Sequence, residues 1–172
     1  MNIYSIGSFR MIIKNKDIYD LIERLHEHYN IFFSNQFIKY YLLDSRIPKS
    51  IWINIEDLMN ATKEHHAVGY ELEKLYEQIL SFASFLQTIK KEVLPRMMSE
   101  AQRRMNKMAT DSRILFKMTL DNAPGNLQIF DDLISELFIA VRAMDTEKNG
   151  KEHALYTKLP YMKNIEEILH LS

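Results

Sequence analysis

Residues 58–93 read LMNATKEHHAVGYELEKLYEQILSFASFLQTIKKEV, and this stretch decides the expected fold. Ten of the eleven a and d positions of a heptad repeat are apolar in it. The a positions are Leu58, His65, Leu72, Ile79, Leu86 and Val93, and the d positions are Ala61, Val68, Leu75, Phe82 and Ile89. A repeat of 3.5 residues keeps one narrow apolar seam facing a partner helix, so the stretch predicts a helix that packs along its length.

Two residues could interrupt this helix. Gly69 lies at an e position, but the repeat keeps its phase across it, so a continuous helix is favoured there. Pro95 removes a backbone hydrogen bond and clashes with the preceding turn, so the chain must kink or reverse. A tight reversal usually contains glycine or several polar residues, which residues 93–96 lack, so a kink is favoured. We expect one helix over about 55–120, kinked or broken at Pro95.

The apolar stripe continues past Pro95 and defines a predicted interaction seam. Its members are Leu72, Leu75, Ile79, Phe82, Leu86, Ile89, Val93, Met97, Met105 and Met108. A straight helix from Leu58 to Leu120 would be about 95 Å long. Two short helices cannot cover that much apolar surface, so the seam predicts a second copy of the chain or another protein. The methionines of the seam either fill gaps in a core or form an adaptable groove for a partner helix.

Shorter helices are expected on both sides of the long one. Apolar spacing predicts helices over 17–33 and 127–144 and a short one over 164–171. Asn15 or Asp17 could cap the first helix, Ser34-Asn35 then offers a break and a fresh N-cap, and Asn54 could cap the long helix. Residues 37–43 are too short and too aromatic for periodicity to distinguish helix from strand. Residues 122–126, NAPGN, predict a turn.

A small β element is expected near the N-terminus. Residues 3–6 and 9–13 are rich in β-branched and aromatic side chains, and Gly7-Ser8 between them suits a two-residue hairpin turn. Residues 50–55 have strand character as well, so they could complete a small sheet. The alternative is irregular chain that caps a helical bundle.

Composition places the chain in a broad class. A length of 172 residues predicts one domain, with an N-terminal region over 1–54, a helical core over 55–145 and a tail over 146–172. The 22 basic and 23 acidic residues nearly balance. There is no cysteine, which excludes disulfides and thiolate zinc sites. No signal peptide and no run of 18 apolar residues is present, so a cytoplasmic protein without a membrane span is expected.

The segment after Pro95 is locally basic. Arg96, Arg103, Lys107, Arg113 and Lys117 would lie opposite the methionine stripe on a continuous helix. Such a basic face could contact phosphates, but no aromatic residues alternate with it to stack on bases. Structural pairing with the acidic residues of flanking helices, or plain solvation, is the favoured interpretation of the basic face.

The histidines give weaker signals. His65 interrupts the heptad repeat at an a position, where a buried histidine could set helix register or respond to pH. A tolerated polar residue near the end of a bundle is the simpler interpretation. Glu23-x-x-His26 and Glu167-x-x-His170 have the spacing that dimetal helical bundles use. The second motif lies two residues from the last residue of the sequence, and two chance matches explain the pair as well.

These patterns rank three functions. The first is a non-enzymatic interaction protein, such as an adaptor, a chaperone-like binder or an assembly component, that acts through the apolar seam as a homo-oligomer or with a protein partner. The second is a nucleic-acid-associated helical protein that uses the basic face. The third is a bundle that binds a metal or a small ligand. No phosphate-binding glycine loop and no nucleophile with its base and orienting group is recognisable, so neither catalysis nor a cofactor is expected.

Overall fold

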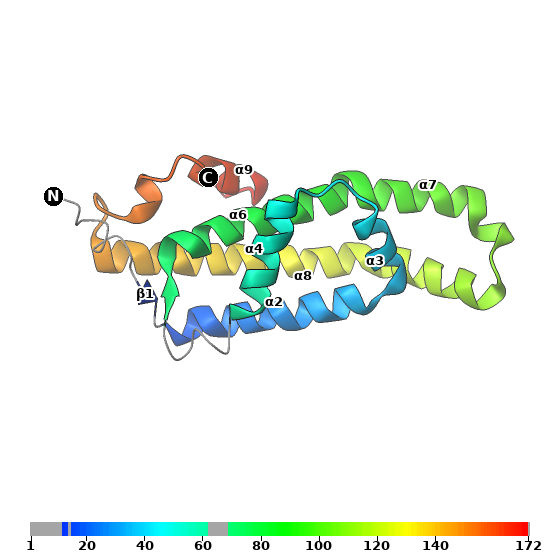
Figure 1. The fold of residues 1–172 in the computed structure, drawn as a ribbon, viewed down its shortest axis with the longest axis horizontal. Helices are drawn as coiled ribbons and strands as arrows, with labels where there is room; N and C mark the ends of the chain where they lie inside the picture. The colour runs from blue at the N-terminus through cyan, green and yellow to red at the C-terminus, as the bar shows by residue number, and fades with distance from the viewer. Residues whose placement is uncertain (1–11, 14, 62–68, 172) are drawn as a thin grey trace.

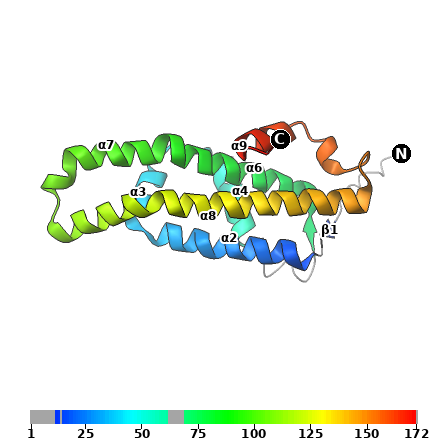
Figure 2. The ribbon, with the colours of Figure 1, turned by 180° about the vertical axis from the view of Figure 1, so that it is seen from behind.

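The computed structural model describes residues 12–13, 15–61 and 69–171, which form an elongated helical bundle (Figures 1 and 2). Three long elements run side by side. They are α2 (Lys16–Ser34), α6 (Leu72–Thr88) with its continuation into α7 (Leu94–Arg104), and α8 (Thr110–Asn149). The predicted mainly helical fold, in which long and shorter helices pack together, is confirmed. Among the described residues, no helix is both long and apolar enough to cross a bilayer.

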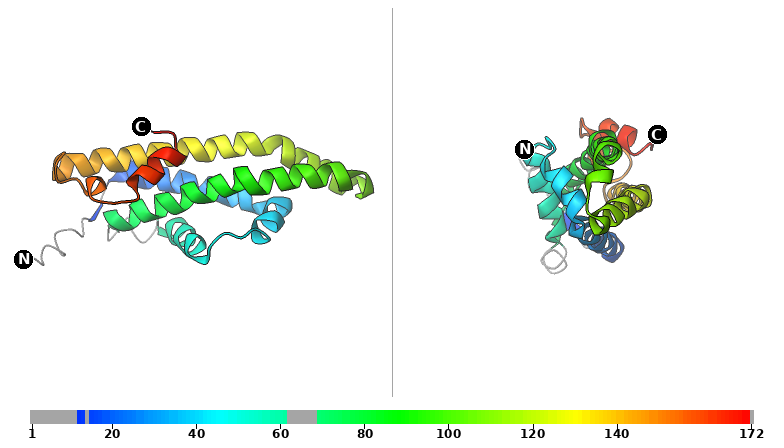
Figure 3. Two further views of the ribbon diagram at one scale, coloured as in Figure 1. Left: turned by 90° about the horizontal axis from the view of Figure 1, so that it is seen from above. Right: turned by 90° about the vertical axis from the view of Figure 1, so that its right-hand side faces the viewer.

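Shorter elements complete the bundle. Helices α3 (Gln36–Leu43) and α4 (Lys49–Met59) lie on one side of the long helices, and α9 (Met162–Ile168) packs on α6 (Figure 3). Two strands, β1 (Ile12–Ile13) and β2 (Tyr70–Glu71), pair antiparallel, with Ile13 opposite Tyr70. Residues 12–13 are therefore in a strand, as predicted, but they pair with residues 70–71, which were predicted to be helical. The rest of the predicted hairpin, residues 3–11, lies outside the described residues.

The prediction of one helix over 55–120 is wrong in its boundaries. Helix α4 ends at Met59, and Gly69 has a φ of +86°, which a side chain with a Cβ rarely tolerates. A strand pair follows directly, so α6 begins only at Leu72. A second interruption lies at residues 105–109. There a 3₁₀ turn, η2 (Met105–Lys107), and extended backbone at Met108 and Ala109 reverse the chain into α8.

The chain does not reverse at Pro95. A π-helical turn, η1 (Ile89–Val93), comes directly before it, and the backbone N–H of Leu94 donates to the carbonyl of Ile89. The wider turn contains an extra residue, which gives the proline ring room without ending the helix. Pro95 is exposed, so water can reach the carbonyl that lacks a donor. The favoured interpretation, in which the helix continues through Pro95, is correct.

The predicted turn at residues 122–126 is also wrong, because α8 runs through Pro124 and Gly125. Buried positions on α8 recur at helical spacing across this point. They are Phe116, Thr119, Ala123, Leu127 and Phe130. Burial of this face against the neighbouring helices outweighs the local cost of proline, which points to solvent. The predicted helix over 127–144 is therefore the second half of a longer one.

Substitutions at this point should stabilise the protein. Proline costs about 3 kcal/mol relative to alanine inside a helix, and it also restricts the unfolded chain. We therefore expect Pro124→Ala to raise the free energy of unfolding by about 1–2 kcal/mol. Gly125→Ala should add about 1 kcal/mol, since a Cβ built there meets nothing within 4 Å. Urea unfolding measures both effects. A loss of stability in both variants would mean that residues 122–126 form a turn.

The strand prediction for residues 50–55 is wrong, because they lie inside α4. Ile55, Leu58 and Met59 are buried at helical spacing, and Ile51 and Trp52 pack against the same core. Asn54 is not a helix cap. Its Nδ2 donates to Ser81 Oγ at 2.9 Å, and its Oδ1 accepts from Lys74 Nζ at 3.1 Å, which ties α4 to α6.

Asparagine caps are correctly predicted at two other places. Asn15 Oδ1 accepts from the backbone N–H groups of Asp17 and Ile18, and it begins α2. Asn35 Oδ1 accepts from Phe37 and Ile38 in the same way and begins α3. Residues 37–43, which periodicity could not assign to helix or strand, are helical and belong to α3. The short C-terminal helix also exists, as α9, over slightly different bounds.

The predicted interaction seam lies in the core of this one chain. Its residues from Leu72 to Met97 are each at most 1% exposed, whereas Met105 and Met108 are partly buried. Phe82 lies at its centre, with ring centroids 5.5 Å from Phe130 of α8 and 6.4 Å from Tyr29 of α2. Because the chain reverses at residues 105–109, α8 folds back and covers the seam together with α2. The seam therefore needs no second chain to bury it.

The C-terminal tail is attached to the bundle through Asp145, which is fully buried at the end of α8. Its two carboxyl oxygens accept four hydrogen bonds. The donors are Tyr76 Oη at 2.8 Å, Asn149 Nδ2 at 2.8 Å, and the backbone N–H groups of Leu155 at 2.9 Å and Tyr156 at 3.0 Å. Burial, reinforced by Asp145, raises the pKa of Tyr76, so its hydroxyl stays protonated and donates. The η3 turn (Leu155–Thr157) is thereby held against α6 and α8.

Candidate interaction groove

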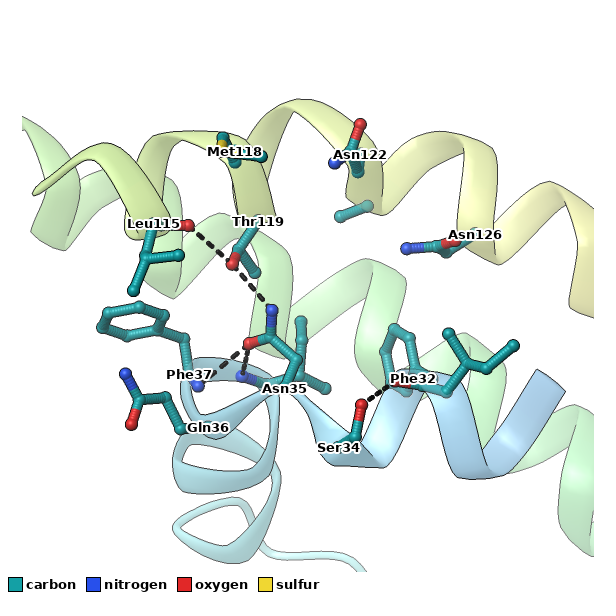
Figure 4. A pocket seen from close by; sticks show the side chains of 13 residues that line it. Phe32, Ser34, Asn35, Gln36, Phe37, Leu115, Met118, Thr119, Asn122 and Asn126 are labelled. Atoms are coloured by element: carbon teal, nitrogen blue, oxygen red, sulfur yellow. Dashed lines mark hydrogen bonds between the residues drawn. The ribbon is translucent and has the colours of Figure 1, made fainter. Parts of the chain in front are cut away.

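A cavity of about 420 Å³ opens between the end of α2, the start of α3 and the first half of α8 (Figure 4). Apolar side chains from all three helices line it, and amide and hydroxyl groups lie among them. The apolar residues are Ile31, Phe32, Phe37, Ile38, Leu115, Met118 and Ala123, and the polar residues are Ser34, Asn35, Gln36, Thr119, Asn122 and Asn126. None of the described residues that line this cavity has an ionisable side chain.

A second hollow, of about 390 Å³, lies further along α2 and α8. It is lined by Arg24, Glu27, His28, Ile31, Ile129, Asp132, Leu133 and Glu136. Ile31 lines both hollows, and we call the two hollows together the α2–α8 groove. On α8 its lining residues recur every three or four positions, as one face of a helix requires. They are Leu115, Met118, Asn122, Asn126, Ile129, Leu133 and Glu136.

Four aliphatic side chains are exposed along this groove. They are Ile31 at 64%, Met118 at 53%, Leu115 at 50% and Ile129 at 46%. A single exposed aliphatic residue is ordinary on a protein surface, but a row of them beside a hollow makes this groove a candidate binding surface. The row runs from the uncharged cavity to the hollow that contains the charged residues.

Hydrogen bonds hold the walls of the groove in place (Figure 4). Asn35 caps α3 with its oxygen, while its Nδ2 donates to Thr119 Oγ1 of α8 at 2.8 Å. Thr119 Oγ1 in turn donates to the carbonyl of Leu115 at 2.8 Å. Further along, His28 Nε2 donates to the carbonyl of Asn126 at 2.9 Å, and its ring packs edge-on against Phe130. The spacing between α2 and α8 is therefore fixed at two points, so the groove is preformed.

The structure separates the predicted basic face into two parts. Arg96 and Arg103 belong to α7, whereas Arg113 and Lys117 belong to α8, on the far side of the reversal at 105–109. The prediction that these side chains share one face of a continuous helix is therefore wrong. Arg103, Lys107 and Lys117 are exposed, and Arg113 is half-buried.

Arg96 has structural partners. Its Nη2 donates to the carbonyl of Tyr41 at 2.9 Å, and its Nη1 lies 3.3 Å from an Asp44 carboxylate oxygen. The guanidinium also lies over the Tyr41 ring, 5.0 Å from the centroid, and Glu100 is a further ion-pair partner. These contacts attach α3 to α7, so Arg96 has the structural pairing that was favoured for the basic face.

The remaining predicted positions do not assemble into a site. Glu23 and His26 lie in α2, whereas Glu167 lies in α9 and His170 lies just after the end of α9. Across residues 12–13, 15–61 and 69–171, no three His, Asp or Glu side chains gather as a metal ion would require. His65 lies outside the described residues.

Sequence reasoning did not identify the groove. Leu115 and Met118 were assigned to the long seam helix, and Ile31 and Ile129 were not singled out. A turn expected at residues 122–126 placed Leu115 and Ile129 on different elements, which hid their common face. A helix drawn through Pro124 would have aligned these residues.

No protein-family model matches the chain, and no match to a curated protein or to a solved structure is found.

Proposed function

We propose that this chain is a non-enzymatic helical interaction protein, an adaptor, chaperone-like binder or assembly component, that binds its partner in the α2–α8 groove. One observation carries the proposal: four exposed aliphatic side chains line a preformed groove between two helices. A hydrophobic groove between helices is a common receptor for apolar segments of other proteins. We expect a cytoplasmic location, because the chain contains no cysteine.

The groove replaces the seam as the proposed binding surface. The seam residues from Leu72 to Met97 are buried inside the chain, so a partner could reach them only if the bundle opened. Ile31, Leu115, Met118 and Ile129, by contrast, are accessible without any rearrangement. Most complexes form with little backbone change, which favours the accessible surface.

The proposal can be tested with two isoleucines of α8. Ile129 lines the groove and is 46% exposed, whereas Ile139 is 48% exposed and lies outside it. We expect Ile129→Glu to weaken partner binding at least about 100-fold, because it places a charge in an apolar contact. Ile139→Glu should bind like the wild type, and both variants should melt within a few degrees of it.

Affinity purification with each protein as bait, then titration of the purified partner by calorimetry, gives the measurement. A partner that binds the wild type and Ile139→Glu but not Ile129→Glu supports the proposal. A partner that binds all three proteins equally, or none that binds the wild type, contradicts it.

A second candidate function is nucleic-acid binding by the hairpin of α7 and α8. Residues 96–117 contain six basic and two acidic side chains, a net charge of +4, in a chain whose net charge is −1. Such a concentration of positive charge favours phosphate contacts. The only aromatic residue of the segment, Phe116, is 3% exposed, so the segment itself offers bases no ring to stack on. For that reason we rank this function second.

Charge reversal separates the two candidates. Arg103 and Lys107 are exposed, so Arg103→Glu with Lys107→Glu should change stability by less than about 1 kcal/mol. If the groove is the binding surface, this double variant should bind the protein partner as tightly as the wild type. Salt-dependent binding of a single-stranded DNA or RNA oligonucleotide that disappears in the variant would reverse the ranking.

A further inference from the structure

We infer that the segment bound in the α2–α8 groove is an amphipathic helix that has lysine or arginine at one end and an uncharged apolar face along the rest. This inference rests on the proposed function and adds the chemistry of the partner. The shape of the groove and the distribution of charge along it both favour such a helix. The described helices that line the groove offer no strand edge to which an extended peptide could add.

The shape favours a helix. The groove follows α8 from Leu115 to Glu136, a rise of about 30 Å, which corresponds to about 20 residues of a docked helix. Its walls are two helices, whose side chains form ridges and grooves that a third helix can pack into. A peptide that binds by adding a strand would need a free strand edge, but the described residues that line the groove belong to α2, α3 and α8, which offer none.

The charge is confined to one end. Among the described residues, the ionisable side chains that line the groove lie in the second hollow, where Glu27, Asp132 and Glu136 outnumber Arg24. None of these three carboxylates forms an ion pair with a cation in the described part of the chain. Asp132 accepts one hydrogen bond, at 2.9 Å from Gln128 Nε2. Three carboxylates without a paired cation form a negative potential that a basic partner residue would neutralise.

The other end has the opposite requirement. The cavity around Leu115 and Met118 has no charged lining residue, and Ile31 and Phe32 extend its apolar surface. A charged partner residue placed there would lose water without gaining an ion-pair partner. The groove therefore distinguishes its two ends, and a helix with a basic end should dock in one direction.

Selection from a phage-displayed library of helical peptides, about 20 residues long, tests the inference. Immobilised wild-type protein is the bait, and the selected peptides are titrated by fluorescence anisotropy. The test variant is Asp132→Lys with Glu136→Lys. The matched control is Glu147→Lys with Glu152→Lys, which changes the net charge equally at exposed positions outside the groove.

We expect peptides with lysine or arginine at one end, whose binding is lost in Ile129→Glu. They should bind the test variant about tenfold more weakly and the control variant nearly as well as the wild type. Peptides that need Ile129 but show no charge preference would overturn the inference and leave the proposed function intact. If no selected peptide depends on Ile129, both fail. A wild-type dimer that Ile129→Glu dissociates would identify a second copy as the occupant and overturn the inference.

Discussion

Phe82→Ala is expected to lower the free energy of unfolding by about 3–5 kcal/mol, through lost burial and the cavity left behind. Phe82 is fully buried, and its ring lies 5.6 Å from Phe85, 5.5 Å from Phe130 and 6.4 Å from Tyr29 between centroids. These rings come from α2, α6 and α8, so one substitution loosens all three long helices. Denaturant unfolding followed by circular dichroism measures the loss.

The concentration dependence of the same variant is the informative part. Because the partners of Phe82 belong to its own chain, its melting temperature should fall but stay the same over a hundredfold dilution. A seam shared between two chains would instead make the melting temperature rise with protein concentration. Ile139→Ala is the matched control, because Ile139 is a large aliphatic residue that is 48% exposed, and it should cost less than about 1 kcal/mol. A Phe82→Ala protein as stable as this control would mean that Phe82 is not part of the core.

Asp145→Asn is expected to cost about 3–4 kcal/mol although it nearly preserves the shape of the side chain. The substitution replaces one accepting oxygen by an NH₂ group that faces the existing donors. Tyr76 and Tyr156 share one carboxyl oxygen and Asn149 and Leu155 share the other, so one of these two pairs would lose its acceptor, depending on the orientation of the amide. Buried donors without partners are among the costliest defects in a folded protein.

Hydrogen exchange distinguishes this local effect from general destabilisation. Whichever of the Leu155 and Tyr156 amides loses its acceptor should exchange much faster in Asp145→Asn, while amides in the centre of α6 and α8 keep most of their protection. Glu147→Gln is the control, because Glu147 is an exposed carboxylate two residues away and should change neither property. Unchanged exchange at Leu155 and Tyr156 would contradict the role assigned to Asp145.

Burial along the seam could be predicted from the sequence because periodicity reports burial directly. The heptad positions from Leu72 to Val93 are all buried, as the repeat requires. The caps at Asn15 and Asn35 could also be predicted, since a short polar side chain before an apolar periodic segment favours the N-cap position of a helix.

Helix ends could not be predicted where local chemistry and tertiary packing disagree. Pro95 and Pro124 both lie inside helices, because each faces solvent while neighbouring residues are buried on the other side. Gly69 lies within the heptad repeat without disturbing its phase, but its positive φ is incompatible with a continuous α-helix at this residue. The reversal at residues 105–109 contains neither glycine nor proline, so no local signal marked it.

The candidate site could not be predicted from the sequence either, because tertiary packing brings its residues together. The α2–α8 groove joins residues from 24–38 with residues from 115–136, and their proximity depends on the reversal that brings α8 back along α2. The sequence alone assigns Ile31 to one predicted helix, Leu115 and Met118 to a second and Ile129 to a third, whereas the structure places the last three on α8. These residues form a candidate binding surface only because the fold places them along one groove.

Site-specific photo-cross-linking tests the central claim, that the α2–α8 groove is the binding surface, most directly. A benzophenone amino acid is placed at Ile129 in one protein and at Ile139 in another, in cells that make the partner. We predict a cross-linked product of one discrete mass from position 129, whose partner peptide is an amphipathic helix, and none from position 139. Equal products from both positions, or a product from position 139 alone, would contradict the account.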